Sequence, residues 1–251
     1  MKLDKAWMDS INIRTSRRKY ESGDIERSKI DNIEAMIESI NEESGLRIKF
    51  VENASDILNG FAASYGMISG ATSLIALIGD SYMQDLKKYI GYYGELLVLE
   101  CTRLGLGTCW IGGTYNKKAC KNSVNLSDNE EVVCIIAVGD VNDEKSFKEK
   151  LVSRLNRKNK SFDETLVSCD GEVLPWIKAG IDASILAPSA MNKQPIAFSF
   201  VDGKLKAFVI KENHGYEYVD LGIAMAHFQL GAFSCGHDGE WQVINGENIF
   251  M

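Results

Sequence analysis

The 251-residue sequence lacks long hydrophobic runs, paired cysteines and a surplus of basic residues. Its longest strongly apolar runs, Leu96–Leu99 and Val132–Val138, are far shorter than the roughly 20 residues that span a bilayer. No apolar stretch follows the first residues, so we expect no secretory signal. The net charge of -7 argues against a general nucleic-acid binder, which needs surplus Lys and Arg. We therefore expect a cytoplasmic protein that binds neither a membrane nor nucleic acid.

Side chains that commonly perform catalysis or bind metals are also scarce. Only three histidines occur, and none has a partner at a spacing that indicates triad chemistry. The six cysteines include no CxxC pair and no Cys/His cluster with zinc-ligand spacing, so we interpret them as reduced structural thiols. No catalytic side chain and no metal site are predicted. A bound cofactor thus becomes the favoured source of any chemistry.

The residues that are present indicate a mixed α+β fold. Hydrophobic residues make up 45% of the chain and charged residues 25%, which is typical of a soluble globular protein. Apolar spacing predicts helices over residues 25–40, 82–104, 175–186 and 218–233. Strands are predicted over residues 46–51, 73–78, 132–141, 196–201 and 205–210. We expect a flexible Gly91–Gly94 to interrupt the second helix.

The predicted elements follow the same order twice, which indicates an internal duplication. At one constant offset, Gly91, Gly105 and Trp110 correspond to Gly222, Gly236 and Trp241. We expect residues 1–160 to form the first half and residues 161–251 a second, shorter half of one intertwined unit. A duplicated unit that cannot bury its own apolar face packs against its copy. The chain is therefore expected to be an intramolecular pseudo-dimer, either as a monomer or paired further as a homodimer.

Four segments have residue patterns typical of ligand binding, and each has a structural alternative. Within Ile13–Tyr20, the six residues 14–19 carry four cations and two hydroxyls that suit a phosphate, or form a solvated charge run. Ala187–Pro195 has small and polar residues that suit the border of a flat ligand, or form an ordinary loop. In Gly105–Gly113, glycines either cap a helix or bring amides to a ligand. Residues 145–160 hold seven basic residues and one acid, as an anion contact or a linker.

Taken together, these segments resemble those of the FMN-dependent nitroreductase family. Arg14-x-Ser16-x-Arg18 is similar to the phosphate-binding segment of the family, and Ala187–Pro195 is similar to its APSxxNxQPW segment. Gly105–Gly112 resembles its GLGSCWIG segment. Ordinary members are homodimers that carry the first two segments close together near the N-terminus. Here those segments lie about 170 residues apart, so the chain resembles a fused variant with about one FMN per chain.

The resemblance implies an FMN-dependent oxidoreductase with a nitroreductase-like fold. Electrons would pass from NAD(P)H through FMN to a small-molecule acceptor, of nitroaromatic or quinone type, by ping-pong hydride transfer. The implied phosphate contacts are Arg14, Ser16 and Arg18, with support from Lys158 and Lys160. The implied ring and ribityl contacts are Pro188, Ser189, Ala190, Asn192 and Gln194, with Trp110, Ile111, Gly112 and Gly113 toward the reactive edge of the ring.

Three alternatives remain open from the sequence. The protein could bind flavin without catalysis, for storage or sensing. It could perform another flavin reaction on the same fold, such as reductive dehalogenation or flavin breakdown, because a fold does not fix a function. It could also have lost the cofactor and serve as an interaction module.

Overall fold

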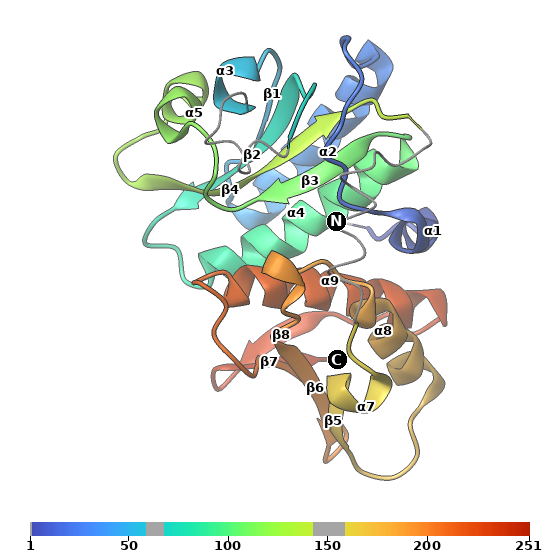
Figure 1. The fold of residues 1–251 in the computed structure, drawn as a ribbon. Helices are drawn as coiled ribbons and strands as arrows, with labels where there is room; N and C mark the ends of the chain where they lie inside the picture. Colours follow the sequence, from blue (N-terminus) through green and yellow to red (C-terminus); the bar gives the residue numbers. More distant parts are fainter. Residues whose placement is uncertain (1, 59–67, 143–158) are drawn as a thin grey trace. The chain divides into compact units, whose positions relative to one another are not determined.

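A computed structural model describes residues 2–58, 68–142 and 159–251 and divides the chain into two compact units (Figure 1). Ile13–Leu86 and Leu97–Arg157 belong to the first unit. Lys2–Asn12, Lys87–Leu96 and Lys158–Met251 belong to the second. Among the described residues, the helices are too short or too polar to cross a membrane.

The first unit is built on a four-stranded antiparallel sheet in the order β1-β2-β4-β3. Its strands are β1 (Lys49–Val51), β2 (Ser73–Asp80), β3 (Gly107–Ile111) and β4 (Glu130–Gly139). Its helices include α2 (Arg27–Ser44), α3 (Ser55–Leu58) and α5 (Lys117–Val124). Both faces of β2 are covered, and this burial explains why its sequence is apolar without alternation. One face of the sheet packs against α3 and α5 in a shared apolar core.

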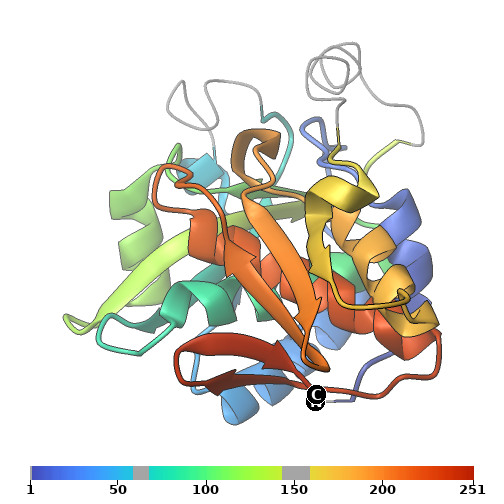
Figure 2. The same ribbon diagram turned by 90° about the horizontal axis from the view of Figure 1, so that it is seen from below.

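The second unit is built on a five-stranded sheet in the order β5-β6-β7-β9-β8. Its strands are β5 (Leu166–Cys169), β6 (Ile196–Val201), β7 (Lys204–Val209), β8 (Trp241–Ile244) and β9 (Glu247–Phe250). Its helices include α7 (Phe162–Thr165), α8 (Pro175–Ile185) and α9 (Glu217–Ser234), and α1 (Ala6–Ile13) lies at the N-terminus. Helices α8 and α9 cover one face of the sheet (Figure 2), where their apolar side chains form the core with β6 and β7.

The two sheets repeat the same topology, in agreement with the predicted order of elements. Strands β6-β7-β9-β8 follow the order of β1-β2-β4-β3, and every neighbouring pair in both sets is antiparallel. The connection before the last strand differs between the halves. Helix α5 precedes β4, whereas a tight turn at Asn245–Gly246, with positive φ at both residues, joins β8 directly to β9. This short turn helps to explain why the second half has fewer residues.

The predicted interruption at Gly91–Gly94 is wrong, because α4 (Leu86–Arg103) is one continuous helix. Its predicted start at residue 82 was also too early. The structure gives a different reason for Gly91. A Cβ atom there would lie 2.0 Å from the Val219 carbonyl oxygen, and a Cβ on Gly222 would lie 2.0 Å from that of Lys88. The two glycines therefore allow close backbone contact between α9 and the Lys87–Leu96 part of α4.

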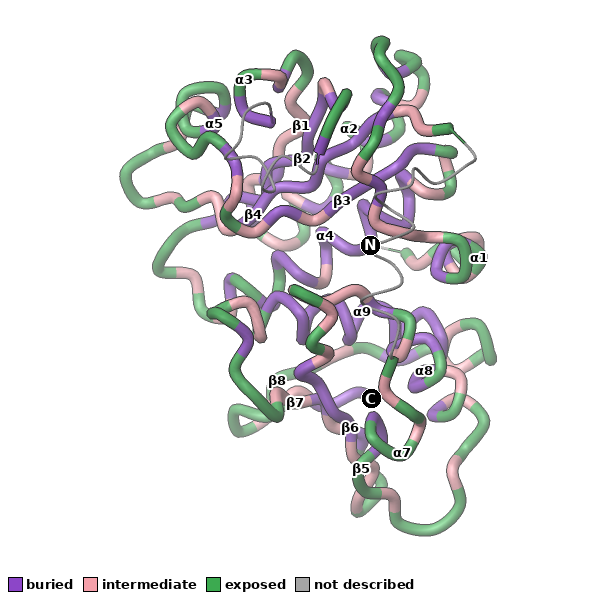
Figure 3. Tube along the Cα trace, in the orientation of Figure 1, coloured by how far each residue is buried: buried purple, intermediate pink, exposed green. Residues whose placement is uncertain are grey.

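Helix α9 is buried along almost its whole length (Figure 3), and its buried polar residues Asp220, His227 and Gln229 are paired. The His227 Nδ1 atom lies 3.0 Å from the Ala183 carbonyl oxygen, and Nε2 lies 2.9 Å from Oε1 of Glu95. A carbonyl oxygen only accepts hydrogen bonds, so Nδ1 donates to Ala183, while Nε2 is hydrogen-bonded to the carboxyl group of Glu95. Both ring nitrogens of His227 thus serve the packing of three helices and are not available to a substrate.

Candidate functional site

The phosphate-type segment Ile13–Tyr20 lies in the first unit, and after the end of α1 its backbone is fixed at two places. Ser16 forms a parallel bridge with Thr108 at the start of β3, and the amide of Arg17 donates to the Thr108 carbonyl oxygen at 2.8 Å. Lys19 forms a second bridge with Ser69. The backbone is therefore held in place before any ligand binds.

Small residues around this segment make room for it. A Cβ on Gly70 would lie 2.3 Å from the Tyr20 carbonyl oxygen, and one on Gly107 would lie 3.0 Å from Cγ of Arg17. The Tyr20 hydroxyl is buried and donates to the Arg17 carbonyl oxygen at 2.8 Å. Gly107 belongs to the glycine-rich segment, so one function of that segment is to admit the arginine-rich chain.

The arginines of the segment differ in how far they are buried. Arg17 is buried, and its guanidinium donates to the Asn142 carbonyl oxygen at 2.8 Å. Arg14, Ser16 and Arg18 are only partly buried. These three alternate along the segment with the buried Arg17. Arg17 therefore has a structural role in this segment, whereas the phosphate contacts of Arg14, Ser16 and Arg18 stay a prediction.

The glycine-rich segment continues along the same strand. Gly105 ends α4 in the left-handed conformation, with φ of 78°, which agrees with the capping alternative for that glycine. Trp110 and Ile111 pair with β4 as part of β3, and Gly112 and Gly113 follow at its end. Because Ser16 pairs with Thr108 on this strand, the first and third segments of the predicted site lie side by side.

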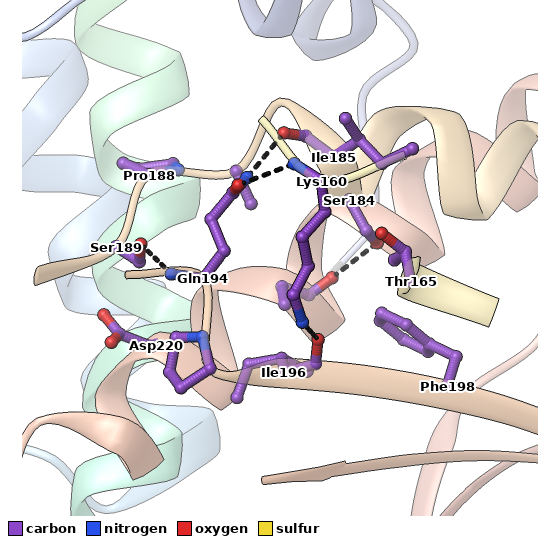
Figure 4. A pocket seen from close by; sticks show the side chains of 13 residues that line it. Lys160, Thr165, Ser184, Ile185, Pro188, Ser189, Gln194, Ile196, Phe198 and Asp220 are labelled. Carbon is purple, nitrogen blue, oxygen red and sulfur yellow. Dashed lines mark hydrogen bonds between the residues drawn. The ribbon is translucent and has the colours of Figure 1, made fainter. Parts of the chain in front are cut away.

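The APS-type segment Ala187–Pro195 lies in the second unit, beside a pocket of about 330 Å³ including its open mouth (Figure 4). This segment forms a short 3₁₀ turn over Ala190–Asn192. Four residues of the predicted site line this pocket, namely Lys160, Pro188, Ser189 and Gln194. Ala190 and Asn192 belong to the turn that follows. The structure thus brings the second segment together with Lys160, whereas Lys158 lies outside the described residues.

Gln194 and Lys160 connect the loop to its surroundings (Figure 4). The Gln194 side chain donates to the Ile185 carbonyl oxygen at 3.0 Å and accepts from the Lys160 amide at 2.9 Å. The Lys160 ammonium donates to the Ile196 carbonyl oxygen at 2.8 Å. Burial, helped by the positive charge of Lys211, lowers the pKa of the Lys160 ammonium. The pocket therefore has a partly buried basic group in its wall.

Asp220 also lines this pocket, and the sequence interpretation missed it. Its side chain is only 3% exposed, although it lies in the first turn of α9. It accepts from the Ala190 amide at 2.9 Å and from Nδ2 of Asn213 at 2.6 Å. A signal was present in the sequence, because Asp220 is followed by the mainly apolar run Leu221–Ala226, and a buried acid requires specific partners.

The titration of Asp220 gives a stability prediction. Burial raises the pKa of its carboxyl from 3.8 to about 6, against the opposing effect of its two hydrogen bonds. A raised pKa in the folded state means that this group stabilises the fold most below pH 3.8, and that this contribution is lost as the pH rises through about 6. The loss amounts to roughly 3 kcal/mol, at 1.36 kcal/mol per pKa unit.

We therefore expect the free energy of unfolding of wild type, relative to Asp220→Asn, to fall between about pH 4 and 7. Urea denaturation at several pH values measures this difference. Asp182→Asn, at an exposed carboxylate paired with Lys178, is the control and should keep a constant difference from wild type. A constant difference for Asp220→Asn as well would contradict the raised pKa.

Other chemistry has little support in the described residues. No group of three or more His, Cys, Asp or Glu in these residues is placed to hold a metal ion. All six cysteines are free thiols. Burial raises the pKa of Cys120 to about 11, and it also raises that of Cys101. Neither thiol therefore supplies much of the nucleophilic thiolate at neutral pH.

Comparison with known proteins adds to this geometry. A family model described as "Putative TM nitroreductase" matches residues 7–232. A crystal structure of a "putative nitroreductase" from Thermotoga maritima shares the fold, with a TM-score of 0.63 and 23% identity, over 97% of this chain and 91% of the other. No match was found among curated proteins.

Two further structures are similar to about half of the chain. An FMN-dependent nitroreductase from Clostridium difficile has 21% identity and a TM-score of 0.46, over 61% of this chain and 99% of the other. A "putative NADH oxidase" from Clostridium acetobutylicum has 25% identity and a TM-score of 0.44, over 55% of this chain and 90% of the other. Similarities with TM-scores this low carry no weight for the function of this chain.

Proposed function

Because the chain belongs to the nitroreductase family described above, we propose that it is an FMN-dependent oxidoreductase. In this proposal NAD(P)H is the electron donor, and a nitroaromatic or quinone-type small molecule is the acceptor. The observation that carries the proposal is the arginine-rich segment, because its backbone is held by Thr108 and Ser69 and its cations and hydroxyl suit a phosphate. The protein works without a membrane or nucleic acid, in the cytoplasm.

The residues of the first unit fit the phosphate of FMN. Arg14 and Arg18 supply planar, forked donors that match phosphate oxygens, and Ser16 adds a hydroxyl between them. Their backbone is already ordered by its pairing with Thr108 and Ser69, so little entropy is lost when the anion binds. Lys158 and Lys160 would add positive charge to the same ligand.

The residues of the second unit fit the ring and ribityl chain. Pro188 and Ser189 provide a compact wall at the pocket, and Ala190 and Asn192 continue it along the 3₁₀ turn. Gln194 holds this wall through its bonds to Ile185 and Lys160. In the first unit, Trp110, Ile111, Gly112 and Gly113 would lie toward the reactive edge of the ring.

When bound, FMN would supply the hydride-accepting chemistry, so the protein needs no nucleophilic side chain or metal. The cations of this chain would stabilise the negative charge of the ligand. The binding segments would hold the ring with one face open to donor and acceptor in turn. Both ring nitrogens of His227 are hydrogen-bonded within the protein, and the thiol of Cys101 is buried. These side chains thus agree with a protein that binds and orients the cofactor and leaves the chemistry to it.

The repeated topology supports the fused arrangement, with residues 1–160 as the first half and 161–251 as the second. The phosphate-type segment occurs only in the first half of the sequence, and the APS-type segment only in the second. A pseudo-dimer built from these halves would keep one complementary site. We therefore propose about one FMN per chain, whether the chain is a monomer or pairs further.

Absorbance spectroscopy of the purified protein tests this function. We expect a yellow protein with about one FMN per chain after saturation with FMN and removal of the excess. Under anaerobic conditions, NADH or NADPH should bleach the flavin, and a quinone or nitroaromatic should restore its colour. A protein that binds no FMN would refute the proposal, and a measured ratio near two would refute the fused site. Bound flavin that neither donor bleaches would favour the storage or sensing alternative.

A further inference from the structure

The loop at the pocket has an unusual backbone. Met191, Asn192 and Gln194 have φ values of 50°, 52° and 43°, in the left-handed region that favours glycine. Such residues cost roughly 1–3 kcal/mol each and persist only where surrounding contacts enforce them. The contacts that enforce this conformation therefore identify the residues on which the loop depends.

Two side chains fix the start of the turn. Asp220 accepts a hydrogen bond from the Ala190 amide at 2.9 Å, and Nδ2 of Asn213 donates to the Ala190 carbonyl oxygen at 3.0 Å. The same Nδ2 atom donates to Asp220 at 2.6 Å, so the three groups form a closed triangle. Both polar groups of the Ala190 backbone are thus bound by side chains. We call Asp220 and Asn213 the Ala190 clamp.

The end of the loop is fixed separately. The Gln194 amide donates to Oγ of Ser189 at 2.9 Å, and the Gln194 side chain binds Ile185 and Lys160. These bonds close the loop on itself and on the end of α8. The Ala190 clamp therefore connects the start of the loop to α9 through Asp220. The bonds of Gln194 fix the end of the loop to Ile185 and Lys160.

The Ala190 clamp is maintained at an energetic cost. Asp220 is buried, although an acid there is harder to ionise than in water. Oδ1 of Asn213 is buried and has no hydrogen-bond partner within the described residues. If the side-chain amide of Asn213 were turned by 180°, Oδ1 would take the place of Nδ2 and face two other acceptors, the Ala190 carbonyl oxygen and the Asp220 carboxyl group. The orientation of this amide is therefore fixed. Several unfavourable features at one place are typical of functional sites.

We propose that Asp220, acting with Asn213, is a positioning residue that holds the loop of Pro188–Asn192 in its flavin-binding conformation before flavin arrives. This inference rests on the proposed function. A loop without the clamp would populate the competent conformation only part of the time, and apparent affinity falls by that fraction. The affinity is lost through slower association, because flavin then meets fewer molecules whose loop already has the competent conformation. Dissociation and the spectrum of the bound flavin stay as in wild type.

The test uses Asp220→Ala and the nearly isosteric Asp220→Asn in the full-length protein, with Asp182→Asn as the control. Hydrogen exchange at residues 189–194 is measured first, without flavin. FMN association and dissociation rates are then measured by stopped-flow fluorescence.

We expect the loop of Asp220→Ala to exchange its amide hydrogens faster and its FMN association rate to fall at least roughly tenfold, because charge-assisted hydrogen bonds are lost. Asp220→Asn keeps an acceptor for Ala190 but places its amide against that of Asn213, so its effect should be intermediate. The control should match wild type.

Several outcomes would overturn the inference. Unchanged exchange in Asp220→Ala would show that the clamp does not order the loop. Faster exchange with an unchanged association rate would show that the order of the loop is irrelevant to flavin. Faster dissociation with an altered flavin spectrum would show direct contact in place of positioning. A wild type that binds no FMN refutes the proposed function itself, whereas the other three outcomes refute only the role of Asp220.

Discussion

Gly91→Ala is expected to destabilise the protein by roughly 3 kcal/mol, at or above the upper end of overpacking substitutions in cores. Helix propensity alone predicts the opposite sign, because alanine stabilises a helix interior by roughly 1 kcal/mol relative to glycine. The packing effect dominates because the new Cβ would meet backbone, the Val219 carbonyl oxygen at 2.0 Å. Backbone atoms cannot move aside as a flexible side chain does. Chemical denaturation measures the difference.

The contact between α4 and α9 is reciprocal, because each helix places a glycine against the backbone of the other. Gly91 approaches Val219 and Ile223, and Gly222 approaches Lys88 and Tyr92. These pairs share the constant offset between the halves, as expected of a self-complementary contact. Gly222→Ala should therefore cost about as much as Gly91→Ala. The double variant should cost less than the sum, because one displacement of the helices relieves both clashes.

Ser39→Ala is the control for this experiment. Ser39 is exposed in α2, so its replacement changes propensity without changing packing. It should leave stability unchanged or slightly raised. If Gly91→Ala behaves in the same way as this control, glycine at this position has no packing role, and the close contact between the helices is not present in solution.

The double variant Arg14→Ala/Arg18→Ala is expected to lose FMN affinity by several kcal/mol, since charge-assisted hydrogen bonds contribute roughly 1.5–3 kcal/mol each. Both residues are partly buried and flank Ser16, whose backbone is paired with Thr108. Their removal should therefore affect the ligand more than the fold. FMN titration followed by flavin fluorescence measures the affinity, and thermal denaturation checks the fold.

Riboflavin separates a phosphate contact from a general effect. It has the ring and ribityl chain but no phosphate, so its affinity should be the same in the double variant and in wild type. Arg27→Ala/Lys118→Ala removes the same charge from exposed positions of the first unit and should leave FMN affinity unchanged. An unchanged FMN affinity in Arg14→Ala/Arg18→Ala, or an equal loss for riboflavin, would show that these arginines do not bind the phosphate.

Most elements of the fold could be predicted from the sequence, because their apolar spacing is local. Helix α9 and strands β2 and β6 lie close to the predicted ranges. The prediction failed at Gly91, where glycine suggested flexibility and the structure shows close packing. The short strands β8 and β9 were not predicted. Their Asn245–Gly246 turn is a strong hairpin signal that was available in the sequence.

The candidate site could be predicted in part, for the same reason. Residues within one short segment, such as Arg14, Ser16 and Arg18, are visible as a pattern. Asp220 and Asn213 act on a loop that lies more than twenty positions earlier, so their role depends on how α9 packs. Arg17 could not be distinguished from Arg14 or Arg18 either, because burial separates them and residue type does not.

Composition and local pattern by themselves determined the mixed α+β class, the repeated order of elements and the segments that resemble a flavin-binding family. These properties follow from side-chain chemistry and from the periodicity of a helix or strand, which act over a few neighbouring residues. The tertiary structure alone decided that two glycines bring helices together, that Arg17 is an anchor, and that a buried acid holds the pocket loop. Each of these depends on contacts between residues distant in sequence, which only the packed chain creates.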